Sequence, residues 1–428
     1  MHLSRRQLIV IGAVVLLVLV IGVLYMFGGQ KPKPPEVSLT MWGTEANEAF
    51  EPLVEEYQKL RPNVKVAYTR LPEAGYGEKI LNALAAGGGP DVFVIGNRDL
   101  AAAKGKLLPV PATTFSLTQL RALFPATVED DFADASGIYA LPLSIDTLAL
   151  FYNKDIFDRA ALIAPPATWD DFVSVVGKLR VADSRGGVTK AAAALGGSSR
   201  TVESAPDILQ LLLFQNGAQL VSADGTTAGF SGGSARGKSV NALNFYLQFA
   251  DAGSSVYTWN ESMPRAREAF AAGKVAMILD YRAARAGLAA QSPFLRVGIA
   301  PAPQVSRDAA VSFPRYKGLV VSRQSRQSAW AWDFVVSVTT NPTIAGGYLA
   351  ASGESPALRS EIGRRLDDPE LGVFAKQALT ARSWRAPGGA QADAIFDAAI
   401  RSVLTGQSDS STALSRANDQ MTQLLQGR

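Results

Sequence analysis

The apolar positions of this chain switch repeatedly between a strand period and a helix period. Apolar residues at alternate positions predict strands, and apolar residues three and four positions apart predict helices. The first predicted elements are a strand over Val37–Trp42, a helix over Ala46–Leu60, a strand over Val64–Tyr68, a helix over Tyr76–Ala86 and a strand over Asp91–Ile95. This order predicts a parallel sheet with right-handed crossovers and helices on both faces.

The later part of the chain continues to alternate between helices and short strands. The predicted helices are Asp207–Asn216, Gly237–Ala252, Glu261–Ala272, Ser328–Thr340, Ala392–Leu404 and Ser411–Leu425, and the predicted strands are Val275–Leu279, Val297–Ala300 and Gly318–Ser322. The sequence contains no internal repeat. Two long α/β halves fit a length of 428 residues, and several chain crossings between them would form a hinge.

The stretch Gly137–Phe172 joins these two halves and combines unlike elements. A β-prone run over Ile138–Leu143 and a second over Thr147–Tyr152 precede a double proline, which favours extended backbone. Thr168 follows the prolines and can cap a helix together with Asp171, three positions later. The stretch therefore predicts a strand, a loop and then a capped helix.

The lack of cysteine and the near lack of histidine exclude most kinds of catalytic site. The chain has no cysteine, and its single histidine is His2. Disulfides, thiolate metal sites, Ser-His-Asp triads and histidine-based zinc sites are therefore excluded from the body of the protein. An enzyme would depend on carboxylates, lysine or tyrosine, and a glycosidase with two acids stays open because such acids need only be close in space. We expect no cofactor and no metal site.

The N-terminal region contains a long run without charge, Leu8–Phe27. Its length matches the roughly 20 residues with which a helix spans a bilayer, and Arg5 and Arg6 before it favour a cytoplasmic N-terminus. A cleaved signal peptide, the alternative, would have an apolar core of about 7–15 residues and a small-residue cleavage site. We therefore expect residues 1–36 to form a cytoplasmic tip, a single-pass transmembrane anchor and a proline-rich linker, with the remaining chain on the extracytoplasmic face.

The basic pI of about 9.1 changes this picture little. The chain has 42 basic and 38 acidic residues, and leaving out Arg5 and Arg6 lowers the basic count to 40. The exported part is thus almost neutral. It carries no concentrated basic stripe, so we expect no nucleic acid partner.

Polar and aromatic residues follow three of the predicted strands. These segments are Trp42–Glu45, Gly96–Arg98 and Asp280–Arg282. In open α/β sheets, ligands bind beyond the carboxyl ends of the strands. Carboxylates and amides suit the hydroxyls of a polyhydroxyl ligand, and aromatic faces suit its C–H surface. Trp42 and Tyr281 could instead pack in the core, as aromatic residues commonly do.

Several motifs in a fixed order resemble one protein family. They are YALP, YNKDIF and PPATWDDF between residues 139 and 172, together with Leu84–Gly87, Gly89–Phe93, Ala269–Met277, Ala300–Pro303, Lys317–Gly318 and Ser355–Ala357. Each motif is weak alone. In this order, over most of Val37–Gln426, they resemble the family 1 extracellular solute-binding proteins of ABC importers, the maltose-binding-protein-like group.

The resemblance implies a type II periplasmic-binding-protein-like fold, in which two α/β lobes close on a ligand in the cleft between them. The implied N-terminal lobe is 37–145 plus about 315–357, and the implied C-terminal lobe is 146–314 plus about 358–428. The implied function is not enzymatic: the protein would bind a sugar or related polar solute and deliver it to ABC permease subunits. A surface sensor or adhesin with the same fold is a further alternative.

The resemblance also implies a set of ligand contacts drawn from both lobes. They are Trp42, Thr44, Glu45, Asn97, Arg98, Asp146, Asp280, Tyr281, Arg282, Tyr316 and Trp384. Ile95 stands where the maltose-binding group often has tryptophan, which argues against maltodextrin itself. Asp146 is expected where the chain crosses between the lobes, and Asp146→Ala is expected to weaken ligand binding while leaving the fold intact.

Overall fold

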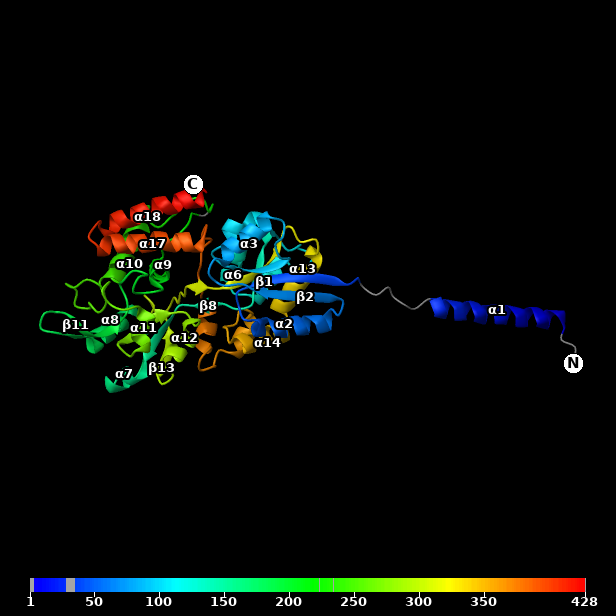
Figure 1. The fold of residues 1–428 in the computed structure, drawn as a ribbon, viewed down its shortest axis with the longest axis horizontal. Helices are drawn as coiled ribbons and strands as arrows, with labels where there is room; N and C mark the ends of the chain where they lie inside the picture. Colours follow the sequence, from blue (N-terminus) through cyan, green and yellow to red (C-terminus); the bar gives the residue numbers. More distant parts are fainter. Residues whose placement is uncertain (1–3, 28–34, 223, 234, 428) are drawn as a thin grey trace.

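The computed structural model describes residues 4–27, 35–222, 224–233 and 235–427. After an N-terminal helix the chain forms two α/β lobes (Figure 1). Each lobe has its own hydrophobic core: one draws mainly on residues 37–145 and 316–362, the other mainly on 148–313 and 384–421. We call them the N-lobe and the C-lobe. The predicted two-lobe α/β architecture is confirmed, and the predicted limits of the lobes stay a prediction.

The N-lobe sheet contains the strand–helix–strand order that the hydrophobic pattern predicts. Its strands follow the order β2-β1-β3-β15-β4, with β7 also paired to β15. Their bounds are β1 Val37–Gly43, β2 Val64–Arg70, β3 Val92–Gly96, β4 Leu107–Leu108, β7 Ala140–Pro142 and β15 Lys317–Ser322. β1 pairs in parallel with both β2 and β3, whereas β15 is antiparallel to β3. Helices α2 (Asn47–Leu60) and α3 (Tyr76–Ala85) form the two crossovers.

The C-lobe sheet is mixed in direction. Its order is β10-β11-β12-β9-β13. The bounds are β9 Ala149–Asn153, β10 Val181–Ala182, β11 Val188–Ala193, β12 Val275–Asp280 and β13 Val297–Pro301. β9 pairs antiparallel with both β12 and β13, so this short apolar strand lies inside the sheet rather than at its edge.

Most of the other elements are helices, and in the C-lobe α17 (Gly389–Leu404) and α18 (Ser410–Leu425) pack side by side (Figure 1). The others are α4 Leu100–Ala103, η1 Lys104–Lys106, α5 Leu117–Leu123, α6 Ala126–Phe132, β5 Ala133–Asp134, β6 Gly137–Ile138, α7 Lys154–Arg159, α8 Trp169–Leu179, α9 Ala205–Gln215, α10 Ala235–Leu247, α11 Ala266–Ala271, α12 Ala284–Gln291, α13 Ser328–Thr340, α14 Pro342–Ser352, α15 Arg359–Arg364 and α16 Gly372–Ala378.

Helix α11 is shorter than the predicted helix over Glu261–Ala272. Pro264 lies inside the predicted range, and a proline disfavours helical backbone in the residue before it. The helix therefore begins only after this proline. Helix α8, by contrast, has the predicted start: Thr168 Oγ1 accepts the N–H of Asp171, and a carboxylate oxygen of Asp171 accepts the N–H of Thr168, both at 3.1 Å.

The chain crosses between the lobes through closely placed segments. Strand β8 (Asp146–Thr147) pairs antiparallel with β14 (Pro314–Arg315), which makes a two-stranded ribbon at the junction. Beside it, the N–H of Ile145 donates to the carbonyl oxygen of Ser355 at 3.1 Å. Asp146 thus lies in a strand that leads from one lobe into the other.

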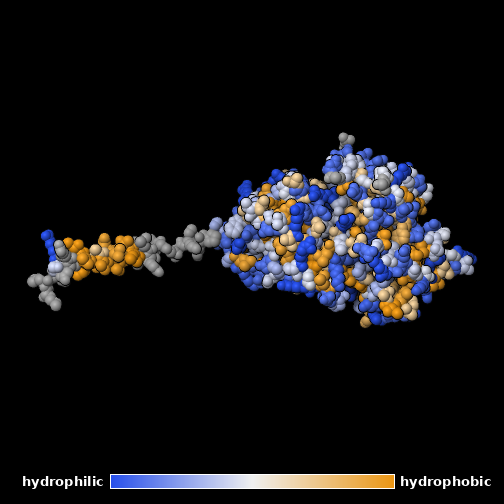
Figure 2. Space-filling model, turned by 180° about the vertical axis from the view of Figure 1, so that it is seen from behind, coloured by the Kyte–Doolittle hydropathy of each residue, from blue (hydrophilic) through white to orange (hydrophobic). Residues whose placement is uncertain are grey.

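Helix α1 (Arg5–Phe27) is drawn apart from the two lobes (Figure 1). The large apolar side chains described within residues 9–21 are exposed, and Figure 2 shows this segment as hydrophobic beside a body of mixed surface. Among the residues that the structure describes, no helix combines the length and the apolar character required to cross a bilayer. The transmembrane anchor stays a prediction, and residues 28–34 of the expected linker lie outside the described residues.

Candidate functional site

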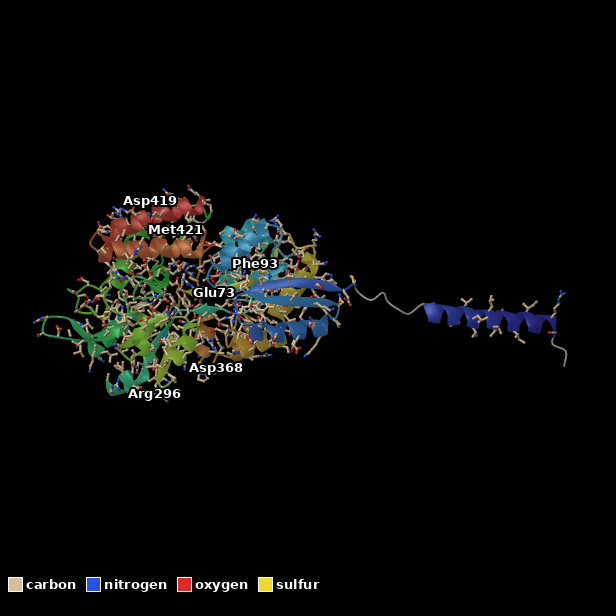
Figure 3. The ribbon with its side chains drawn as sticks, in the orientation of Figure 1. Glu73, Phe93, Arg296, Asp368, Asp419 and Met421 are labelled. Carbon is tan, nitrogen blue, oxygen red and sulfur yellow. The ribbon has the colours of Figure 1, made fainter. Side chains whose placement is uncertain are left out.

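A cavity of about 590 Å³ lies between the two lobes. Glu45 after β1 and Asn97 and Arg98 after β3 line it from the N-lobe, and Tyr281 after β12 lines it from the C-lobe. Figure 3 labels Glu73, a further lining residue, near the junction of the lobes. The cavity therefore lies beyond the carboxyl ends of three strands, where ligands bind in open α/β sheets.

Arg98 connects the two lobes across this cavity. Its side chain is 4% exposed, although it comes from the loop after β3. One guanidinium nitrogen donates to Asp207 Oδ1 of α9 at 2.7 Å, and another donates to the carbonyl oxygen of Gly389 at 2.7 Å and to Asp393 of α17. All three acceptors belong to C-lobe helices, so a single N-lobe side chain joins the lobes.

Arg315 of β14 completes a charge-balanced cluster with these residues. Its guanidinium lies 2.9 Å from a carboxylate oxygen of Asp207 and 2.9 Å from one of Asp393. Burial alone would raise the pKa of Asp207. The positive charges of Arg315 and Arg98 have the larger combined effect, so the pKa of Asp207 is lowered. Burial and the charge of Asp207 raise the pKa of Asp393. Two guanidinium groups thus face two carboxylates; Arg98 and Asp207 are buried, whereas 51% of the Arg315 side chain is exposed.

A second buried carboxylate, Asp131 of α6, supports the N-lobe wall of the cavity. Its Oδ2 accepts from the hydroxyl of Tyr316 at 2.7 Å and from the side-chain amide of Asn97 at 3.0 Å. Asp131 is 1% exposed. Burial raises its pKa to about 7, against the opposing effect of these donors. Asn97 and Tyr316 both line the cavity, so Asp131 fixes two of its polar groups from behind.

Lys317 supplies a cation to the N-lobe wall of the cavity. Its ammonium group donates to Thr44 Oγ1 at 2.8 Å, Glu45 Oε1 at 3.3 Å and Glu73 Oε2 at 3.2 Å. Lys317, Glu45 and Glu73 all line the cavity, whereas Thr44 is outside its lining. This part of the wall therefore offers exposed charge and hydrogen-bonding groups to a polar ligand.

Asp146 lines the cavity from the crossing strand, but its carboxylate already has three backbone partners. Oδ1 accepts from the N–H groups of Thr147 at 2.8 Å and Arg282 at 3.0 Å, and Oδ2 accepts from that of Ala283 at 3.0 Å. Burial raises the pKa of Asp146 to about 7. A buried donor left without its acceptor costs about 1–3 kcal/mol. Asp146→Ala is therefore expected to lower the free energy of unfolding, and the expectation that it leaves the fold intact stays a prediction.

The structure brings six of the predicted contacts to the cavity and leaves the other five outside its lining. Those at the cavity are Glu45, Asn97, Arg98, Asp146, Tyr281 and Tyr316, and those outside it are Trp42, Thr44, Asp280, Arg282 and Trp384. Trp384 is buried and donates its indole N–H to Gln210 at 2.8 Å. Asp280 is buried and binds Arg267 at 2.6 and 2.8 Å. Ligand contact by the predicted residues stays a prediction.

Five residues that build the site were not predicted: Arg315, Lys317 and Asp393 line the cavity, and Asp131 and Asp207 support residues that line it. The reason is that their partners are distant in the sequence. Asp207 lies in a predicted helix, and its only local signal is a place in the first turn of that helix. Among the described residues, no group of three or more acidic or histidine side chains is arranged to hold a metal ion.

Comparisons with known proteins agree with this geometry. Residues 42–344 match the family model of the bacterial extracellular solute-binding proteins. A protein of Brucella abortus with the general name of a binding protein is 22% identical over 306 residues, which cover 69% of this chain and 70% of that one. A cyclo/maltodextrin-binding protein complexed with maltotetraose has a TM-score of 0.75 at 20% identity, covering 92% of this chain and 99% of its own.

A cyclic α-maltosyl-1,6-maltose binding protein from Arthrobacter globiformis is similar to the same extent. Its TM-score is 0.74 at 19% identity, with 92% of this chain and 100% of that chain covered. These structures share the two-lobe fold, and the matched family consists of binding proteins rather than enzymes. The family resemblance drawn from the motifs is thereby confirmed: this chain belongs to the family of bacterial extracellular solute-binding proteins.

Proposed function

We propose that this protein captures a sugar, an oligosaccharide or a related polar solute and delivers it to the permease of an ABC importer. The observation that carries the proposal is the interlobe cavity of about 590 Å³, which receives polar groups from both lobes. Hydroxyl groups of a sugar can bond to the carboxylates and amides there. Tyr281 and Tyr348 in the lining add aromatic surface for its C–H faces. The sugars named with the similar structures support the same ligand class.

Capture needs no chemical step. A solute that contacts both lobes binds the closed arrangement more tightly than the open one, and this difference in affinity drives closure. The short ribbon of β8 and β14 is placed to take up the rotation, because the chain crosses between the lobes there in strands of only two residues each. The glycosidase alternative loses its support, since the family is one of binding proteins.

Isothermal titration of the full chain in mild detergent tests the proposal. The panel comprises maltose, maltotetraose, mannobiose, tagatose and glucose. We expect one or more of these to bind with one site per chain, and we expect no product by chromatography. Hydrolysis of a bound sugar, or no heat with any sugar or other polar solute, would contradict it. Binding without uptake of the bound sugar in the cells from which the protein comes would favour the sensor alternative.

We further propose that residues 1–36 hold the body at the outer face of the membrane. The uncharged run Leu8–Phe27, the helical form of α1 and its exposed apolar side chains between residues 9 and 21 support this. The full chain is expected in the membrane fraction after an alkaline carbonate wash, and a chain that begins at Val37 is expected in the supernatant. Release of the full chain by the wash would refute the anchor.

A further inference from the structure

Asp207 is a buried carboxylate outside the lining of the cavity. Three residues of that lining nevertheless donate to its carboxylate. Asp207 lies in the first turn of α9 and is 1% exposed. Its Oδ1 accepts from Arg98 at 2.7 Å. Its Oδ2 accepts from the hydroxyl of Tyr281 at 2.9 Å and lies 2.9 Å from the guanidinium of Arg315. The carboxylate is thus fully used within the protein, and it faces the cavity only through its partners.

The three donors come from three separate parts of the fold. Arg98 belongs to the N-lobe loop after β3, Arg315 to the crossing ribbon, and Tyr281 to the C-lobe segment after β12. Their orientations are also linked to one another, because the guanidinium carbon of Arg315 lies 5.7 Å from the centre of the Tyr281 ring. One group therefore sets the direction of side chains from both lobes and from the hinge between them.

Charge balance makes this arrangement depend on the ionised form of Asp207. Asp207 and Asp393 together offset Arg98 and Arg315. Without the charge of Asp207, two guanidinium groups would share a single carboxylate, and a buried charge without its partner is costly. Mutual repulsion would then turn Arg315, whose side chain is already 51% exposed, further toward solvent and away from Arg98.

We propose that Asp207 is a positioning residue of the solute site: it holds Arg98, Arg315 and Tyr281 in their binding orientation and couples the N-lobe wall of the cavity to the C-lobe wall. The effect of Asp207 on solute affinity rests on the proposed function. Its role in joining the lobes does not depend on which solute binds.

Asp207→Asn keeps the shape of the side chain and removes its charge. Because the chain has no cysteine, Lys59→Cys on α2 and Lys178→Cys on α8 can carry spin labels, one on each lobe. The full chain is measured without sugar. We expect Asp207→Asn to lengthen or broaden the distance between the labels, and to weaken binding of maltotetraose, or of whichever panel sugar the wild type binds, at least tenfold.

The double variant Asp207→Asn/Arg315→Gln separates positioning from packing. It restores charge balance with Arg98 and Asp393, so the distance is expected to return toward that of the wild type. If Asp207 only packs α9, the second substitution restores nothing, and this result would overturn the proposal. An unchanged distance and affinity in Asp207→Asn would overturn it as well.

Glu361→Gln is the matched control. Glu361 lies in α15, is 1% exposed and is outside the lining of the cavity. Its carboxylate pairs with Arg364 of the same helix and with Arg365, which follows the helix. We expect Glu361→Gln to change the free energy of unfolding without changing the distance between the labels.

If neither Asp207 variant folds, Tyr281→Phe removes one donor only, and an unchanged label distance and sugar affinity in that variant would refute the proposal. If the wild type binds no sugar, the proposed function fails while the distance measurement still decides the role of Asp207.

Discussion

Replacing Arg98 with methionine is expected to lower the free energy of unfolding by about 3–5 kcal/mol, the usual cost of breaking a buried ion pair by removing one partner. The methionine keeps much of the apolar volume of the side chain, so the loss reports the guanidinium. Without it, Asp207 and Asp393 stay in the protein with only Arg315 between them, and the carbonyl oxygen of Gly389 loses its donor. Chemical unfolding at neutral pH measures the change.

Arg121→Gln gives the comparison for this prediction. Arg121 pairs with Glu129 at 2.6 Å on the surface of the N-lobe, where 61% of the arginine side chain is exposed. An exposed pair of this kind contributes about 0–1 kcal/mol. Equal losses in the two variants would mean that the Arg98 cluster contributes no more than a surface pair, and the interlobe connection would then lack the strength assigned to it.

The parts of the fold that follow from local pattern were predictable from the sequence. Helix α13 has the predicted bounds, Ser328–Thr340, because its apolar spacing is regular and Pro342 follows it. The cap formed by Thr168 and Asp171 was predictable because both partners lie within one turn. Strand β15 was expected as a strand, but its antiparallel pairing with β3 is set by the return of the chain from the C-lobe. No pattern within the strand carries that direction.

The strand-end rule predicts part of the site, and the family resemblance adds Asp146 and Tyr316. Asn97, Arg98 and Tyr281 follow their strands and line the cavity as the strand-end rule suggests. Asp207 meets Arg98 across 109 positions of sequence, so neither residue carries a local sign of the pair. For Trp384 the family resemblance implied a ligand contact, and the structure places its indole in the C-lobe core and outside the lining of the cavity.

The pH dependence of stability is expected to contain one large contribution from Asp131. Burial raises its pKa to about 7 in the folded protein, from 3.8 in an unperturbed aspartate. The folded state then binds this proton more tightly than the unfolded chain does, so the free energy of unfolding falls as the pH rises between about 4 and 7. A shift of one pKa unit corresponds to 1.36 kcal/mol, so the full loss is about 4 kcal/mol.

Asp131→Asn replaces the carboxyl group with a neutral group of the same shape and so removes this loss. Relative to the wild type, the variant should gain about 4 kcal/mol between pH 4 and pH 7, in urea unfolding at several pH values. The contribution of Asp146, whose pKa is raised in the same direction, is present in both proteins and cancels in the difference.

Asp171→Asn should behave in the opposite sense. The hydrogen bond from Thr168 lowers the pKa of Asp171, so the stability that this carboxylate contributes is lost as the pH falls. Parallel curves for Asp131→Asn and the wild type would show that Asp131 is ionised in the folded protein at pH 4–7. Because Asp131 accepts from Asn97 and Tyr316 at the cavity wall, the same measurement tests whether the wall is built around a neutral acid or an anion.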